Sequence, residues 1–176
     1  MTCQPLRIQF FTDVGLHGEK KPFLAWYAML HANTRLTERI NAELEAEAGL
    51  PLSWFEVLAK ISWAPEECAR MGILADDLLL SRGGATRLIA RMEEAGLVRR
   101  EIPAHDRRAT YAHVTDAGRE ALERAAPIHM AKVDEYFHAQ LTDEEIDVLA
   151  RAMGKVLRGL GADVDWLLED LEAAPQ

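Results

Sequence analysis

The sequence predicts a mainly helical fold that contains one small β-hairpin. Apolar residues recur at helical spacing over most of the chain, whereas two short segments, 97–102 and 110–114, have the composition of strands. The chain has 176 residues, of which 49% are hydrophobic and 28% charged, a balance typical of a folded protein. We therefore expect one domain with extensions.

The composition does not favour a membrane or secreted protein. No apolar run approaches the ~20 residues that a membrane helix needs. The first residues show no basic stretch leading into an apolar core, as a secretory signal would. The two cysteines, Cys3 and Cys68, cannot build a disulfide framework and suit a reducing compartment. We expect a cytoplasmic protein with no membrane partner.

The first half of the chain begins with an arm and a long helix. Residues 1–21 have no clear period and are expected to be loosely tethered. From Phe23 an apolar stripe predicts a helix to about residue 48. Gly49 and Pro51 then mark its end and a new start.

Two shorter helices are expected next. Ser53 and Glu56 have the spacing of a capping box at the start of the first. A short apolar helix over about 70–79 forms the second. Ser81 stands where the following helix would be capped.

The helix predicted over 82–95 is the most informative element. Its apolar positions share one face, which we expect in the core: Ala85, Leu88, Ile89 and Met92. The opposite face is small at its start and basic in its middle: Gly83, Arg87, Ala90 and Arg91, flanked by Thr86. Gly83 and Gly84 cost about 1 kcal/mol each relative to Ala, so we expect another backbone to approach closely there.

The hairpin follows directly. Gly96 is placed to end the preceding helix, and the segment 103–108 forms a long, positively charged tip between the two strands. Because Arg99 and Arg100 alternate across a strand, we expect one to face an outside partner and the other to pair with Glu101 or another acid.

Two helices are expected after the hairpin. The first begins at about Thr115 and runs into the 130s, with Pro127 bending or interrupting it. The second opens with a capping-box match, Thr142 to Glu145, and continues to about Gly159. An acidic tail completes the chain.

The charge distribution separates the hairpin region from the rest. The chain carries a net charge of −9, which alone would argue against nucleic acid. Residues 81–119 nevertheless hold eight arginines and no lysine against five acids. Arginine suits bidentate contacts to phosphate or guanine. A solvated basic surface is the alternative that charge alone leaves open.

The order of the elements is that of a winged helix-turn-helix: helix, turn, capped helix with outward arginines, then a hairpin with an arginine tip. A helix of this width enters the major groove, where its first residues reach base edges. The hairpin beside it can place an arginine in the minor groove. Double-stranded DNA is therefore the expected partner.

An ordered set of motifs resembles the MarR family of bacterial transcriptional regulators over about residues 22–160. The set comprises Leu80-Ser81-Arg82, Thr86-Arg87-Leu88, the run from Arg91 to Arg100, Asp106-Arg107-Arg108, and the run from Val114 to Arg119. Each piece alone means little, whereas the ordered set is highly specific.

The resemblance implies a role for each matching residue. It makes 82–95 the recognition helix, Asp106 a brace of the wing and Arg108 the wing-tip arginine in the minor groove. The DNA-binding set that we expect is Ser81, Arg82, Gly83, Thr86, Arg87, Arg91, Arg107 and Arg108. For Ser81, helix capping comes first and a phosphate contact second.

The resemblance also implies a homodimer with interlocked terminal helices. We accordingly expect an arm over 1–21, a dimerisation helix over 22–49, a DNA-binding lobe over 50–119 and dimerisation helices over 120–160. The acidic tail then covers 161–176.

A small aromatic or phenolic ligand is the effector class that the family suggests. The aromatic residues of the first two helices are more often core than pocket. If a pocket exists, Trp26, His31 and Trp63 are its candidates. Cys3 and Cys68 are better interpreted as incidental thiols than as redox sensors. The histidines and cysteines form no metal-ligand motif, so we expect no metal and no cofactor.

Three classes of function are compatible with a folded chain of this kind. The leading interpretation is a homodimeric repressor of pseudo-palindromic operators that a small ligand relieves. An enzyme is disfavoured because the chain has no nucleophile elbow, phosphate-binding glycine loop or metal dyad. The alternative is a winged-helix protein-interaction module without specific DNA binding, and the salt dependence of DNA affinity would separate it from the first.

Overall fold

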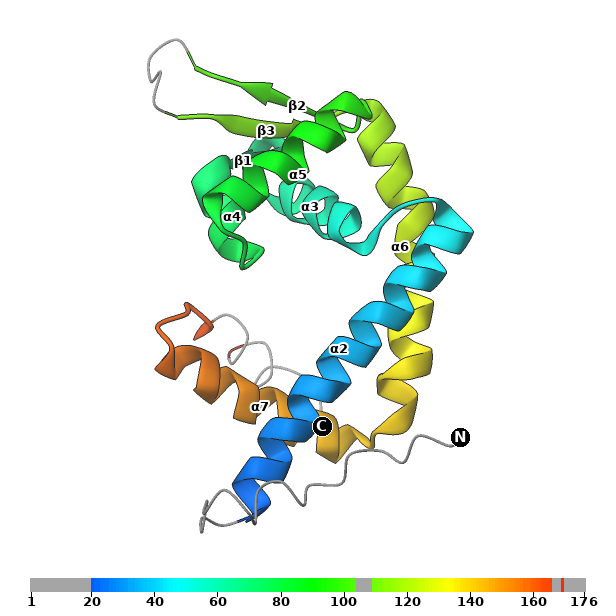
Figure 1. The fold of residues 1–176 in the computed structure, drawn as a ribbon, viewed down its shortest axis with the longest axis vertical. Coiled ribbons are helices and arrows are strands. Elements are labelled where there is room, and N and C mark those ends of the chain that lie inside the picture. The colour runs from blue at the N-terminus through cyan, green and yellow to red at the C-terminus, as the bar shows by residue number, and fades with distance from the viewer. Residues whose placement is uncertain (1–19, 104–108, 166–168, 170–176) are drawn as a thin grey trace, which may run out of the picture. The chain divides into compact units, whose positions relative to one another are not determined.

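A computed structural model describes residues 20–103, 109–165 and 169. The chain forms two compact units, residues 1–37 and 38–176. One long helix, α2 (Lys20–Ala48), begins in the first unit and ends in the second (Figure 1). Within the first unit, the rings of Tyr27 and His31 stack along this helix with their centroids 4.0 Å apart.

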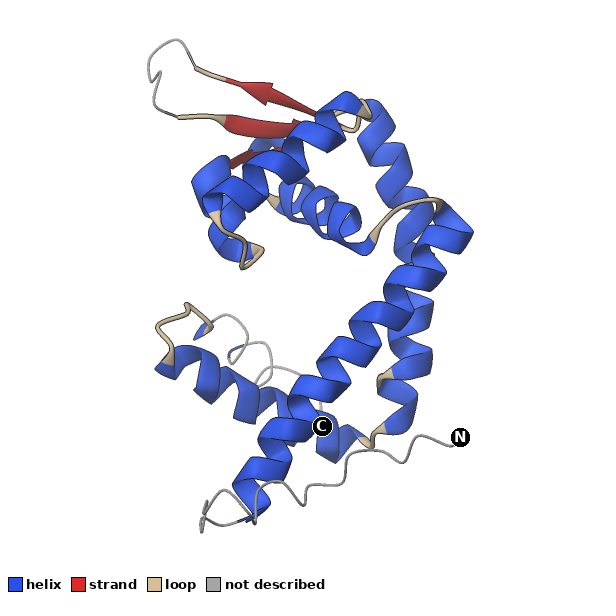
Figure 2. Ribbon diagram, in the orientation of Figure 1, coloured by secondary structure: helices blue, strands red, loops and turns tan. Residues whose placement is uncertain are grey.

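The second unit is mainly helical with a small sheet, as the sequence predicts (Figure 2). Its elements are α3 (Leu52–Trp63), η1 (Pro65–Glu67), β1 (Cys68–Arg70), α4 (Met71–Asp77), α5 (Arg82–Glu94), β2 (Val98–Glu101), β3 (Tyr111–Val114), α6 (Asp116–Tyr136), η2 (His138–Gln140) and α7 (Asp143–Gly159). None of the helices in the described part of the chain is both long and apolar enough to cross a membrane.

The sheet has three antiparallel strands in the order β1-β3-β2, where the sequence predicted only two. β2 and β3 form the expected hairpin, with Val98 opposite Val114. β1 pairs with the other side of β3, with Cys68 opposite His113. The three residues of β1 are too few to show a period, so the strand depends on its partner and periodicity could not reveal it.

One hydrophobic core joins α3, α4, α5, α6, the sheet and the end of α2. The predicted inner face of α5 is buried throughout: Ala85, Leu88, Ile89 and Met92. Leu44, Leu58 and Ile61 are among the fully buried side chains, and burying one such side chain contributes about 1.5–3 kcal/mol. The core therefore holds α5 by one face and leaves its other face exposed (Figure 1).

Two predicted helix ends are confirmed. Thr142 and Glu145 form a reciprocal capping box at the start of α7. Gly96 follows the end of α5 with φ +75°, and the N–H groups of Gly96 and Leu97 donate to carbonyls of the last turn at 2.9 Å. This is the glycine-dependent Schellman ending.

The capping box predicted at Ser53 is wrong. Helix α3 begins earlier, at Leu52, with Pro51 in the N-cap position and no side-chain cap there. The Leu52 N–H instead donates to Asn41 Oδ1 at 2.9 Å. Because Asn41 lies on α2, a contact between helices satisfies this N–H at the start of α3.

The start of α6 packs tightly against Leu97, which lies in the turn between α5 and β2. Thr115 caps α6 by accepting from the Gly118 N–H at 3.1 Å. A Cβ at position 118 would overlap the carbonyl oxygen of Leu97, so only glycine fits there. Pro127 lies inside α6, which runs uninterrupted to Tyr136.

Candidate nucleic-acid interface

Helix α5 begins with the cap that the sequence predicted. The Gly84 N–H donates to Ser81 Oγ at 3.1 Å. Such a cap typically stabilises a helix by about 1 kcal/mol. Ser81 is also exposed, so its second predicted role, a phosphate contact, stays open to it.

The outer face of α5 is exposed as predicted, except that Ala90 is half-buried. Its exposed members are Arg82, Gly83, Thr86, Arg87 and Arg91. Thr86 Oγ1 donates to the Arg82 carbonyl at 2.8 Å, which holds the threonine side chain against the helix. The face therefore has small side chains at Gly83 and Thr86, and long cationic side chains at Arg87 and Arg91, about one and two turns after Gly83.

The two glycines of α5 have different surroundings. A Cβ at Gly84 would lie 3.2 Å from the capping Ser81 Oγ. A Cβ at Gly83 would meet only the tip of Arg87, at 3.5 Å. Nothing within the described chain requires glycine at position 83, and the approach of an outside backbone there stays a prediction.

The arginines of the second unit fall into two groups. Seven of those between residues 38 and 165 that the structure describes lie within 4.0 Å of a carboxylate: Arg39, Arg99, Arg100, Arg119, Arg124, Arg151 and Arg158. Over the same described range four have no such partner: Arg70, Arg82, Arg87 and Arg91. Since acidic residues outnumber basic ones 29 to 20, the lack of partners on α5 marks a surface suited to an anion.

The prediction for the two strand arginines is half wrong. Arg99 pairs with Glu101 at 2.6 Å, as one of them was expected to do. Arg100 is not free either, because its guanidinium lies 2.5 Å from Glu93 and its N–H donates to the same carboxylate. These hydrogen bonds from Arg100 hold the pKa of Glu93 below its ordinary value. Glu93, near the end of α5, therefore pairs with Arg100, so both arginines of β2 have carboxylate partners.

The tip of the wing lies outside the described residues. Asp106, Arg107 and Arg108 belong to the segment 104–108, so the roles predicted for them stay predictions.

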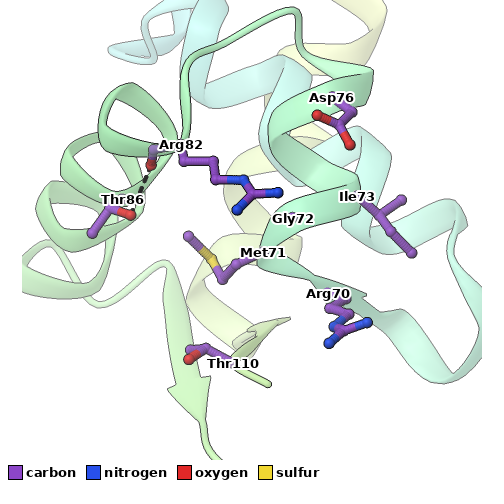
Figure 3. Close-up of a pocket in the computed structure, with 8 residues that line it drawn as sticks. All are labelled: Arg70, Met71, Gly72, Ile73, Asp76, Arg82, Thr86 and Thr110. Atoms are coloured by element: carbon purple, nitrogen blue, oxygen red, sulfur yellow. Dashed lines mark hydrogen bonds between the residues drawn. The ribbon is translucent and has the colours of Figure 1, made fainter. Parts of the chain in front are cut away.

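A cavity of about 470 Å³ lies between α4 and α5 (Figure 3). Arg70, Met71, Gly72 and Asp76 line it from β1 and α4, and Arg82 and Thr86 line it from α5. Figure 3 shows Arg82 extending from α5 toward Gly72. The sequence did not single out Arg70, because the strand that presents it was not expected.

The three ligand candidates are not core residues in this chain. Trp26 is 56% exposed and Trp63 is 80% exposed, which contradicts the expectation that the aromatic stripe is mainly core. His31 is exposed as well. None of the three lines the cavity between α4 and α5. Phe55, in contrast, is buried and stacks on His129 with centroids 4.4 Å apart.

Cys68 has a neighbour that the sequence could not show. Its Sγ lies 3.7 Å from His113 Nε2, and the same nitrogen lies 3.4 Å from a Glu101 oxygen. Burial, and then the carboxylates of Glu101 and Glu66, raise the pKa of the Cys68 thiol. A thiol of this kind is a poor nucleophile, in keeping with an incidental cysteine. Within the described residues, no group of three or more His, Cys, Asp or Glu side chains could hold a metal.

A three-stranded wing beside a capped helix with exposed arginines defines a winged helix-turn-helix protein. A sequence model of the MarR family matches residues 48–109. The crystal structure of Sco3205, a MarR family transcriptional regulator from Streptomyces coelicolor in complex with DNA, is 32% identical, with a TM-score of 0.78 over 83% of this chain and 91% of that chain. AbsC, a MarR family transcriptional regulator from the same organism, is 31% identical, with a TM-score of 0.76 over 81% and 96%.

Sequence relatives agree with the structural ones. YkoM of Bacillus subtilis (strain 168), an uncharacterised helix-turn-helix regulator, is 38% identical over 68 residues, which are 39% of this chain and 44% of the relative. The chain spans about half the length of the first curated relatives that it matches. The chain belongs to the MarR family, as the motifs implied. This is a family of DNA-binding transcriptional regulators and not of enzymes, in agreement with the sequence.

Proposed function

We propose that the chain is a cytoplasmic, homodimeric repressor that binds pseudo-palindromic operators and is relieved by a small aromatic ligand. The exposed face of α5 carries this proposal. Three of its arginines have no carboxylate partner among the described residues, while the two arginines of strand β2, Arg99 and Arg100, do. A cationic surface without internal partners is what a DNA-binding helix requires.

The residues on the outer face of α5 would make different kinds of contact with DNA. Arg87 and Arg91 are long enough to reach base edges, where arginine pairs with guanine. Gly83 and Thr86 leave room for the helix to approach, and Ser81 and Arg82 lie at its start, where contacts to phosphate are common. For the wing tip, Arg107 and Arg108 would bind in the minor groove and Asp106 would brace them.

Exposed apolar stripes support the homodimer. Helix α7 buries only Gly154 within the described chain. It exposes large apolar side chains at helical spacing: Val148, Leu149, Val156 and Leu157. In the first unit, α2 likewise exposes Leu24, Trp26, Tyr27 and Leu30. A second copy of the chain would bury these faces, and two lobes related by a twofold axis would contact half-sites about one helical turn apart.

Relief by a ligand is the second half of the proposal. Trp26 and His31 in the first unit, and Trp63 in the second, each expose a ring that an aromatic or phenolic compound could stack against. Such a ligand would need to disfavour the DNA-competent state by about 1–3 kcal/mol to act as an inducer.

DNA binding across a salt series tests the proposal. The purified chain is titrated against its own upstream DNA and against random DNA, with Arg108→Ala alongside. We expect tight, saturable binding that the substitution weakens. The logarithm of the association constant should fall steeply as the logarithm of the salt concentration rises. Sedimentation should show a dimer, and candidate phenolic compounds should lower the affinity. Equal, weak and salt-insensitive binding to both DNAs would instead favour the protein-interaction module.

A further inference from the structure

We propose that Arg70 is a further contact to the DNA backbone, and that a phosphate group binds between Arg70 and Arg82 at the cavity between α4 and α5. The inference rests on the proposed function because it extends the same DNA surface. It concerns a residue outside both the recognition helix and the wing tip.

The backbone fixes the place of Arg70. It is the last residue of β1 and lies opposite Tyr111 of β3. The next N–H, that of Met71, donates to the Thr110 carbonyl at 2.9 Å. This pairing holds the residue at the rim of the cavity whatever its side chain does, so the guanidinium is not needed to form the strand.

The charges around the cavity favour an anion. Arg70 and Arg82 both line it. Both are exposed, and neither lies within 4.0 Å of a carboxylate among the described residues. Asp76 is the carboxylate on the same lining, and it forms no ion pair within the described part of the chain. Two guanidinium groups free of internal partners suit the oxygens of a phosphodiester, which arginine can contact by two hydrogen bonds.

The position of the cavity favours DNA over a dissolved anion as the source of the phosphate. The cavity borders α5 at Arg82 and Thr86, on the face proposed to enter the major groove. In a helix-turn-helix, the helix before the recognition helix crosses the DNA backbone, and α4 is that helix. At least half of all protein–DNA hydrogen bonds go to phosphate and sugar.

The test compares Arg70→Gln with Arg124→Gln. Both variants remove one positive charge, but Arg124 lies on α6 beside Glu120, away from the cavity lining. Affinities for a selected operator and for random duplex are measured across a chloride series. We expect Arg70→Gln to weaken binding to both DNAs by a similar factor of about 3–10 and to flatten the salt slope by about 0.9 for each phosphate that the protein no longer neutralises. Arg124→Gln should match the wild type, and Arg70→Lys should retain most of the slope.

A second variant tests the site without changing Arg70. The side chain of Asp76 is exposed and forms no hydrogen bond or ion pair with the described residues, so Asp76→Asn should fold normally. Removing this negative charge should strengthen the binding of both DNAs about two- to threefold.

Three results would overturn the proposal. The first is steep wild-type binding that Arg70→Gln and Asp76→Asn both leave unchanged, an outcome that still supports the proposed function. The second is a reduction in affinity confined to the operator, which would make Arg70 a base contact. The third is that Arg70→Gln binds inorganic phosphate more weakly than the wild type but binds DNA with the wild-type affinity. The NMR signal of the Gly72 amide would report the binding of inorganic phosphate.

Discussion

The arginines of α5 and those of strand β2 differ in what surrounds them. Arg99 and Arg100 each lie within 2.6 Å of a carboxylate oxygen, whereas Arg87 and Arg91 have no carboxylate partner among the described residues. The two arginines of β2 therefore serve the fold of the wing. In an acidic protein, cations left without partners indicate a surface that meets an anion from outside.

The largest expected effect comes from the unpaired group. Arg87→Ala should weaken operator binding by about 10- to 100-fold, since a good arginine–base pair is worth about 1–3 kcal/mol. Binding to random DNA should fall much less, and the free energy of unfolding should not change. Competition titrations with the two DNAs measure the difference. A similar reduction for Arg100→Ala would remove the distinction between the groups.

The sequence could predict features that depend on local spacing, but not contacts between residues that only the fold brings together. The helical period placed the core and outer faces of α5 correctly, because both depend on local spacing. It could not show that Arg100 pairs with Glu93, seven residues away across a turn. Nor could it show β1, whose pairing brings Arg70 to the cavity. Contacts made by packing have no local signature.

The next effect separates stability from binding at the start of α5. Gly83→Ala should raise the free energy of unfolding by up to about 1 kcal/mol, because the Cβ would make only an ordinary contact with the tip of Arg87 and alanine favours the helix. The same methyl group should weaken DNA binding by about tenfold if the DNA backbone approaches there. Thermal melts and operator titrations measure the two. Gly84→Ala is the control, since its Cβ would crowd the Ser81 cap and bring no such gain in stability.

A smaller effect is expected for the paired group. Arg100 lowers the pKa of Glu93, so this pair stabilises the fold above the ordinary carboxyl pKa and ceases to do so as the pH falls through the lowered one. Glu93→Gln should therefore destabilise the protein at pH 7 by no more than about 1 kcal/mol, as expected for a pair near the surface. Urea melts at pH 7 and below pH 4 should show the difference from wild type shrinking at the lower pH. A difference that stays constant with pH would speak against the pair.

The smallest effect concerns His129 in α6. Burial lowers the pKa of this histidine, whose Nδ1 has no hydrogen-bond partner among the residues that the structure describes. Since the unfolded chain binds the proton more readily, the histidine costs stability as the pH falls below its ordinary pKa of about 6.5. His129→Phe should reduce the loss of stability between pH 7.5 and pH 5.5, as followed by thermal unfolding. Parallel curves for the two proteins would show that His129 does not contribute.

The most direct test of the difference between the two groups compares two double variants that remove the same charge. The variant Arg87→Gln/Arg91→Gln removes two arginines without carboxylate partners among the described residues. The variant Arg99→Gln/Arg119→Gln removes two arginines that have carboxylate partners. Operator affinity is measured for both across one salt series. We predict a reduction of at least 100-fold and a flatter salt slope for the first pair, with the second pair close to wild type. Equal reductions for the two pairs would contradict this, because net charge and not the exposed face of α5 would then determine binding.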